Sequence, residues 1–140
     1  MTAPSISSVK VGDELPALVK PPISRTTLAL FAGASNDHNP IHIDTDFAKK
    51  AGMPDVFAHG MLVMAYMAEL VTNWEPQSAL REFGTRFGAI TQLGEKINCT
   101  GKVTEIVTQN GETCARLELA AANEAGEQKL AGHALVALDA

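Results

Sequence analysis

The stretch from Gly60 to Thr72 constrains the fold more than any other part of the chain. It reads GMLVMAYMAELVT, so that apolar residues occupy nearly every side of a helix formed there. Such a helix is buried on most sides rather than lying on a surface. It therefore needs a large apolar element around it, and the β patterns that follow in the chain predict a sheet.

Four strand-like segments follow this helix, at about 80–87, 96–109, 112–122 and 128–138. Asn110-Gly111 predicts a two-residue hairpin, and the run from Asn123 to Gly126 predicts another turn. Strands joined by such short turns are antiparallel. We therefore expect an α+β fold, with one domain over residues 1–140 in which a curved antiparallel sheet wraps the long central helix.

The first half of the chain is expected to add short elements ahead of this helix. Ser24 predicts one helix N-cap and Thr45 predicts a second, with Gly52 at the C-cap of the second helix. Pro21-Pro22 ends the strand before them. The expected elements are, in order, a loose leader (1–10), a strand (15–20), a helix (25–34) and a short helix (46–51).

The bulk properties exclude several classes of protein. A net charge of −5, a pI near 5.3 and the lack of a Lys/Arg cluster argue against nucleic acid as a partner, although Lys49-Lys50 leaves an anionic ligand open. No apolar run reaches the roughly 20 residues of a membrane span, and no signal peptide is read. A disulfide between Cys99 and Cys114 is not expected, because nothing indicates secretion. We expect a cytoplasmic protein, with part of its 46% apolar residues in a subunit interface.

The strongest chemical signal lies ahead of the central helix. The segment from Ser35 to Asp44 reads SNDHNPIHID, which places Asp37 and His42 five residues apart. Asn39-Pro40 rules out regular helix there, because proline lacks an N–H and disfavours helical geometry in the residue before it. A carboxylate and an imidazole held on one turn are candidates for a general acid/base pair. The alternative is that Asp37 caps a turn and His42 is a structural histidine.

A metal site is a competing interpretation of the same segment. Its spacing does not fit a calcium loop, because Ile41 and His42 occupy the next ligand and glycine positions. The chain also has no His-Glu-x-x-His helix for zinc. We expect no metal and no other cofactor.

His59, Gly60 and Met61 open the central helix. The first N–H groups of a helix lack internal partners and lie at its positive end. Because Gly60 has no side chain, a thioester oxygen that gains charge could approach them, which predicts an oxyanion site; the alternative is that Gly60 only permits close packing. Arg86 could reach a phosphate or be an ordinary solvated arginine. Ser35 is a poor nucleophile, because no Gly-x-Ser-x-Gly elbow surrounds it.

These residues give the chain a family resemblance. The segment SNDHNPIHID, with Phe47-Ala48 after it, resembles the hydratase-2 motif of MaoC-like (R)-specific enoyl-CoA hydratases and dehydratases. The segments AHGML (58–62) and Arg86-Phe87 with Gly94-Glu95 match that family in order and spacing. The resemblance covers about residues 10–138, and similar members include the B subunits of actinobacterial (3R)-hydroxyacyl-ACP dehydratases.

The resemblance implies a hot-dog fold that acts as a dimer and reversibly hydrates a trans-2-enoyl thioester of CoA or acyl carrier protein, in fatty-acid metabolism. The product is the (R)-3-hydroxyacyl thioester. Asp37 and His42 would activate the water, the Gly60 N–H would hold the thioester oxygen, and Asn39 would brace the loop. A second group is expected to contact the substrate or support the site: Ser35, His59, Met61 and Arg86.

Three positions depart from the family pattern. Asn36 stands where many members have glycine, Ile90-Thr91 replaces a usual Pro-Val, and Ala68 stands where some hydratases have serine. Two alternative functions remain open: the catalytic subunit of a heteromeric hot-dog dehydratase, and an acyl-thioester-binding or thioesterase module. The Asn-Pro-Ile-His block favours a hydratase over a thioesterase, and the pair Asp37 and His42 favours a catalytic subunit over a supporting one.

Overall fold

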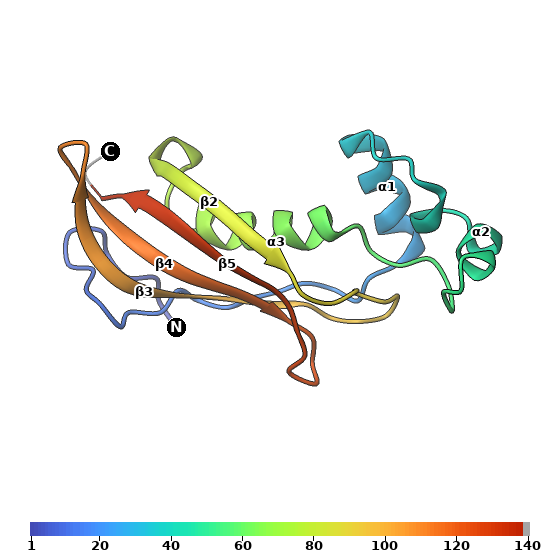
Figure 1. Cartoon of the computed structure of the whole chain (residues 1–140). Coiled ribbons are helices and arrows are strands. Elements are labelled where there is room, and N and C mark those ends of the chain that lie inside the picture. Colours follow the sequence, from blue (N-terminus) through green and yellow to red (C-terminus); the bar gives the residue numbers. More distant parts are fainter. Residues whose placement is uncertain (139–140) are drawn as a thin grey trace.

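The computed structural model describes residues 1–138 and is built on a curved antiparallel sheet. Its strand order is β1-β3-β4-β5-β2, and it curls around the central helix α3 (Figure 1). The strands are β1 (Leu18–Val19), β2 (Leu80–Phe87), β3 (Asn98–Gln109), β4 (Glu112–Ala122) and β5 (Gln128–Ala137). The expected hairpin joins β3 to β4, where Asn110 (φ 50°) and Gly111 (φ 78°) supply the positive φ angles of a tight turn. The predicted α+β class is confirmed.

The three α-helices agree with the predictions except at the caps of α2; Ser24 caps α1 as predicted, its hydroxyl accepting the Thr27 N–H. The helices are α1 (Arg25–Ser35), η1 (Pro40–His42), α2 (Thr45–Lys50), α3 (Gly60–Thr72) and η2 (Gln77–Ala79). The prediction that Thr45 caps α2 is wrong: the Asp44 carboxylate accepts the N–H groups of Asp46 and Phe47. A carboxylate at the positive end of a helix adds a charge interaction to the hydrogen bonds. Ala51 is the C-cap, and Gly52 follows it with φ at 87°.

The strand expected at 15–20 is shorter than predicted. Only Leu18 and Val19 form β1, and Glu14 makes an isolated bridge with Lys102. Pro16 lies between these two contacts, and a proline has no N–H to give to a ladder. The proline therefore limits the ladder in this segment to fewer residues than predicted.

The main core lies between the concave face of the sheet and α3. Val63, Met67 and Val71 of α3 are at most 1% exposed and pack against buried residues of β3, β4 and β5. The sheet residues in this core include Val103, Leu117, Leu119, Leu130 and Ala134. Cys99 and Cys114 are both buried and lie toward opposite ends of the β3–β4 ladder, so they cannot join within one chain. Burial raises the pKa of the Cys99 thiol to about 12, which makes it inert.

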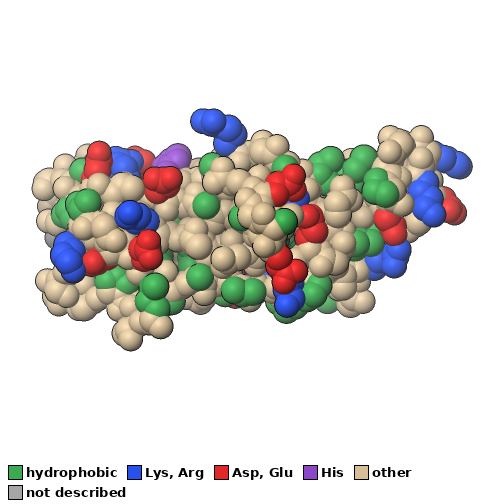
Figure 2. Space-filling model, turned by 90° about the horizontal axis from the view of Figure 1, so that it is seen from below, with side chains coloured by type: hydrophobic (Ala, Val, Ile, Leu, Met, Phe, Trp, Pro, Cys, Tyr) green, Lys and Arg blue, Asp and Glu red, His purple; other side chains and the backbone are tan. Residues whose placement is uncertain are grey.

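The helix α3 is buried on most sides, as its apolar pattern predicts, but not on all. Met61 is 55% exposed and Ala65 is exposed, so one side of the helix is open in the single chain. None of the described helices has both the length and the apolar character needed to cross a membrane. Figure 2 shows one face of the molecule, on which Lys and Arg side chains alternate with Asp and Glu and form no basic patch.

A second apolar cluster fixes the helices α1 and α2 beside the start of α3. Its buried members are Ile23, Leu28, Ala48, Val56, Ala58 and Leu62. Figure 1 shows α1 and α2 together at one end of the molecule, beyond the sheet. The loop between α1 and α2, which carries the Asp/His segment, is thus anchored on both sides next to the N-terminus of α3.

Gly132 of β5 offers a test of this packing. A Cβ added there would lie 2.7 Å from the Gly84 carbonyl oxygen and 2.6 Å from Cε of Met67, and the backbone oxygen cannot move aside. We expect Gly132→Ala to lower the free energy of unfolding by about 1–3 kcal/mol in urea denaturation. Gly33→Ala in α1 is the control, since its Cβ meets nothing within 4 Å. That change should raise stability by about 0.5–1 kcal/mol. Equal effects at both sites would contradict this packing.

Candidate active site

The loop that carries Asp37 is held by its own side chains. Asn36 follows α1 in the left-handed region (φ 62°, ψ 17°), which asparagine tolerates better than most residues. Asparagine in place of the family's glycine therefore keeps this turn. The Ser35 hydroxyl accepts the Asp37 N–H (3.2 Å), and the Asp37 carboxylate accepts the Asn39 N–H (3.2 Å). These contacts place Ser35 as a supporting residue of the loop.

Asn39 and Pro40 turn the chain into η1, which carries His42. The Asn39 side-chain oxygen accepts the Ile41 N–H (3.1 Å), and Pro40 takes a first-turn position where no N–H is needed. Asp44 then caps α2. Asn39 thus lies where a bracing residue is expected, and consecutive turns leave the segment little freedom.

The His42 ring points toward the segment ahead of α3. Its Nδ1 lies 2.7 Å from the carbonyl oxygen of Phe57. Because a carbonyl only accepts, Nδ1 carries the proton, and Nε2 of the neutral ring is an acceptor. One backbone carbonyl therefore selects the tautomer in which Nε2 can take a proton.

His59 lies against His42 and ties the loop to α3. The two rings are stacked, with centroids 4.0 Å apart and 29° between their planes. Nε2 of His59 donates to the backbone carbonyl of Asp37 (3.2 Å), and its Nδ1 is buried without a hydrogen-bond partner among the described residues. Burial is the main cause that lowers the pKa of His59, against the opposing effect of the bond to Asp37. The ring is therefore neutral near pH 7.

Asp37, His42 and His59 bring possible ligand atoms within 4.8 Å of one another. These residue types do bind metal ions. However, an imidazole lone pair lies in the plane of its ring, and one ion cannot lie in the planes of two rings stacked in this way. One nitrogen of each ring also faces a carbonyl oxygen. The cluster fits proton transfer better than metal binding.

The N-terminus of α3 faces a hollow of about 380 Å³, which Gly60 lines together with Phe57, Phe87 and residues 88–91. His59, the N-cap, makes no side-chain capping bond, so the first N–H groups of α3 are not satisfied by a cap. The Phe87 ring covers Gly60, since a Cβ there would lie 2.8 Å from two ring carbons. Asp37 and His42 do not line this hollow. Phe57 stands between, with its carbonyl bound to His42.

Two of the expected site residues, Met61 and Arg86, lie apart from the cluster of Asp37, His42 and His59. Met61 is half exposed on the open side of α3. A Cβ built on Gly132, which pairs with Thr85 of β2, would meet Met67 of α3. Thr85 therefore faces the helix, and the next residue, Arg86, faces away from it. Arg86 is exposed on the outer face and is not brought to Gly60.

Sequence reasoning missed the contributions of Phe57 and Phe87 to the site. Phe57 acts through its backbone carbonyl, which no side-chain pattern reports. Phe87 belongs to the Arg86-Phe87 motif, and the alternation of side chains along a strand predicts that the two residues point to opposite faces of the sheet. A larger hollow of about 450 Å³, between the N-terminal segment and β3 and β4, holds none of the expected site residues.

Comparisons with known proteins agree with the geometry. The (R)-specific enoyl-CoA hydratase of Rhodospirillum rubrum is 29% identical over 89 residues, which are 62% of this chain and 62% of that protein. The mitochondrial 3-hydroxyacyl-[acyl-carrier-protein] dehydratase of Arabidopsis thaliana is 29% identical over 89 residues, 64% of this chain and 52% of that protein. The matched parts thus span little more than half of each relative.

The fold is similar to that of the R-hydratase PhaJ1 from Pseudomonas aeruginosa in its unliganded form. The TM-score is 0.82 with 26% identity, over 94% of this chain and 83% of that one. The long helix wrapped by a curled antiparallel sheet is the hot-dog fold, which confirms the expectation from the sequence. The MaoC like domain model matches residues 7–125. The chain therefore belongs to the MaoC-like family.

Proposed function

We propose that the chain is a hydro-lyase that reversibly hydrates trans-2-enoyl thioesters to (R)-3-hydroxyacyl thioesters. The observation that carries the proposal is the meeting of Asp37 with a His42 whose Nδ1–H is bound to the Phe57 carbonyl, beside the N-terminus of α3. The names of the relatives, one acting on CoA and one on acyl-carrier-protein thioesters, support this reaction class and both carriers. We place the reaction in fatty-acid metabolism of the cytoplasm.

In the proposed mechanism, water adds across the double bond of a substrate held between the Asp37–His42 pair and the N-terminus of α3. Nε2 of His42 takes a proton from the water as its oxygen bonds to Cβ, and the Asp37 carboxylate orients that water. Negative charge moves to the thioester oxygen, where the N–H of Gly60 and the positive end of α3 stabilise it. A proton from the Asp37–His42 pair then reaches Cα and completes the addition. Because the two groups interact, they are treated as one acid/base unit.

The proposed working unit is a dimer, either of two copies or with a second hot-dog chain. Large apolar side chains of α3, β2 and α2 are exposed in the single chain: Met61 (55% exposed), Phe87 (52%) and Phe47 (44%). Within the described residues, β2 is also an edge strand with one side unpaired. Because this chain carries both Asp37 and His42, it would be the catalytic member of either dimer.

Asp37→Asn and His42→Gln test the acid/base pair. With crotonyl-CoA, each is expected to lower kcat/KM by about 10²–10⁴-fold, because each removes a group that transfers or orients the proton. Loss of the enoyl absorbance measures turnover, and a thiol reagent detects any hydrolysis. His38→Gln and Asp46→Asn, exposed residues of the same region, should retain near-parent rates. Near-normal turnover in both folded test variants would contradict the proposal. Thiol release by the parent protein would also contradict it, because it reports hydrolysis of the thioester.

Gly60→Ala tests the oxyanion site at α3. We expect the added methyl group to keep the thioester oxygen away from the helix N–H groups, so that kcat falls by about 10²-fold. The methyl group also meets the Phe87 ring at 2.8 Å. The double variant with Phe87→Ala removes that clash and should recover thermal stability but not activity. Recovery of activity in the double variant would show that Gly60 serves packing alone.

The lowered pKa of His59 makes the stability of the folded chain depend on pH. This lowered folded pKa means that, as pH falls below the ordinary imidazole value of about 6.5, the unfolded chain takes up a proton that the folded chain does not. His59 therefore contributes stability above that pH, which is lost as pH falls toward the lowered folded pKa. We expect the urea midpoint to drop between pH 7.5 and 5.5. In His59→Gln, which keeps an N–H donor for the Asp37 carbonyl, the drop should be smaller; an equal drop would contradict the assignment.

A further inference from the structure

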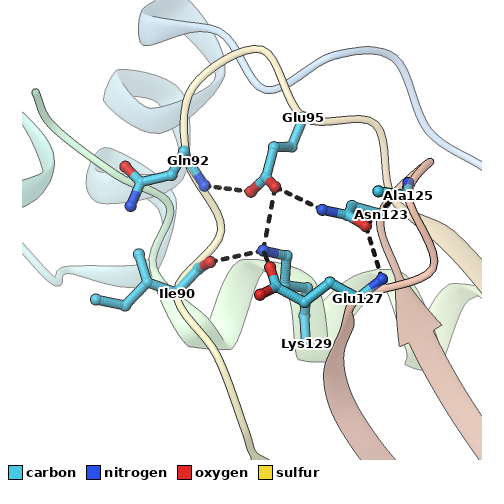
Figure 3. A network of polar contacts seen from close by, with 7 residues as sticks. All are labelled: Ile90, Gln92, Glu95, Asn123, Ala125, Glu127 and Lys129. Atoms are coloured by element: carbon cyan, nitrogen blue, oxygen red, sulfur yellow. Dashed lines mark hydrogen bonds and ion pairs between the residues drawn. The ribbon is translucent and has the colours of Figure 1, made fainter. Parts of the chain in front are cut away.

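Lys129 is a charged residue in the interior of the fold, outside the groups used so far. It is 1% exposed. Its ammonium group donates to the Ile90 carbonyl (2.8 Å), lies 3.1 Å from Oε1 of Glu95, and also binds the Glu127 carboxylate. Figure 3 shows these groups around the lysine nitrogen: Ile90 and Glu95 come from the loop after β2, and Glu127 lies just before β5.

A bulge in the sheet accounts for the direction of the Lys129 side chain. Along the β4–β5 ladder, Ala122 pairs with Gln128 and Ala121 pairs with Leu130, so Lys129 is an extra residue of β5. A bulge re-aims the side chain that it carries. The Lys129 carbonyl also accepts the N–H groups of Gly88 (2.8 Å) and Ala89 (3.2 Å). Backbone and side chain of one residue thus grip the same loop.

Glu95 completes this grip from the other end of the loop. Its Oε2 accepts the Gln92 N–H (2.6 Å), and its Oε1 accepts from the Asn123 side chain (2.8 Å) as well as from Lys129. Burial alone would lower the pKa of Lys129, but the hydrogen bonds that its ammonium group donates to Glu127 and Glu95 outweigh burial and raise that pKa, so the lysine stays charged. Moving charges out of water costs free energy, and apolar residues of similar size in place of a buried ion pair often give equal or greater stability. We therefore attribute this buried cluster to the position in which it holds the loop.

The gripped loop leads directly to His42. Between the two anchors, the Thr91 carbonyl accepts the Ala58 N–H (2.9 Å), and Gln92 bridges to Phe57. The Phe57 carbonyl is the acceptor that selects the His42 tautomer. Residues 88–91 also form one wall of the hollow beside Gly60. A shift of this loop would move both the wall and the carbonyl.

We propose that Lys129 and Glu95 are positioning residues for catalysis: they hold the loop 88–95 so that the Phe57 carbonyl keeps His42 in its acceptor tautomer. This inference rests on the proposed hydratase function for its kinetic consequence. Its structural consequence, the His42 tautomer, can be measured independently of any activity.

Two variants separate the parts of the cluster. Lys129→Met keeps the length of the side chain and removes the three contacts of the ammonium group. Glu95→Gln keeps the shape, but its amide oxygen must face the two donors at Oε1. Its NH₂ group then faces the Gln92 N–H, which releases the loop there. Lys96→Met is the matched control, because it removes the lysine next to Glu95, whose ammonium lies 3.7 Å from the exposed Glu124.

We expect kcat on crotonyl-CoA to fall by about 10–10²-fold in Lys129→Met and Glu95→Gln, with KM changed less than about threefold. The ¹⁵N spectrum of the His42 ring should change from a single Nδ1–H tautomer in the parent to a mixture in both variants. Lys96→Met should match the parent in both measurements. Lys129→Arg, which keeps the charge, should recover part of the loss.

The outcomes distinguish the two proposals. If the parent protein shows no hydratase activity, the proposed function fails, and the His42 spectrum alone decides the role of Lys129. If Lys129→Met does not fold, Glu95→Gln carries the test, since it replaces the carboxylate by a neutral group of the same size. A parent-like His42 spectrum and a kcat within about twofold of the parent in the folded variants would overturn the inference.

Discussion

Burial of α3 is the constraint on which the other parts of the structure depend. The helix has too many apolar residues to lie on a surface, and the sheet curls far enough to cover Val63, Met67 and Val71. The helix begins outside the curl, where α1 and α2 form a second apolar cluster around Leu62. The polar groups of the site therefore stand at the boundary between two cores. That position gives them a rigid support on both sides while Asp37 remains exposed.

Much of this fold could be predicted from local signals. The α3 helix, the Asn110-Gly111 hairpin and the long strands each depend on residues close in sequence, so a single sequence shows them. The length of β1 and the cap of α2 depended on competition between neighbours: Pro16 interrupts a ladder, and the Asp44 carboxylate outcompetes the Thr45 hydroxyl. Which side of α3 stays open depends on contacts far apart in the chain, and periodicity does not report them.

The candidate site was predictable in its chemistry and less so in its geometry. The spacing of Asp37 and His42 around Asn39-Pro40 indicated that the two side chains are held together, and their ligand atoms lie within 4.8 Å in a cluster with His59. The hydrogen-bond partner of His42 is a backbone carbonyl, which any residue at position 57 would supply. The burial of Lys129 could not be predicted from the sequence, because a bulge removes this residue from the strand alternation by which buried positions are predicted.

The choice of a carbonyl rather than a carboxylate as the partner of His42 has an electrostatic consequence. A carboxylate would fix the same tautomer but would add a second negative charge beside Asp37, where the proposed reaction develops charge on the thioester oxygen. The Phe57 carbonyl fixes the tautomer without a net charge, and burial keeps His59 neutral. In the proposed reaction, the positive end of α3 stabilises the charge that develops on the thioester oxygen. A neutral carbonyl must be placed accurately, because its dipole attracts the His42 N–H only at short range and in line with it. The buried cluster of Lys129 and Glu95 provides this accuracy by holding the loop with which Phe57 pairs.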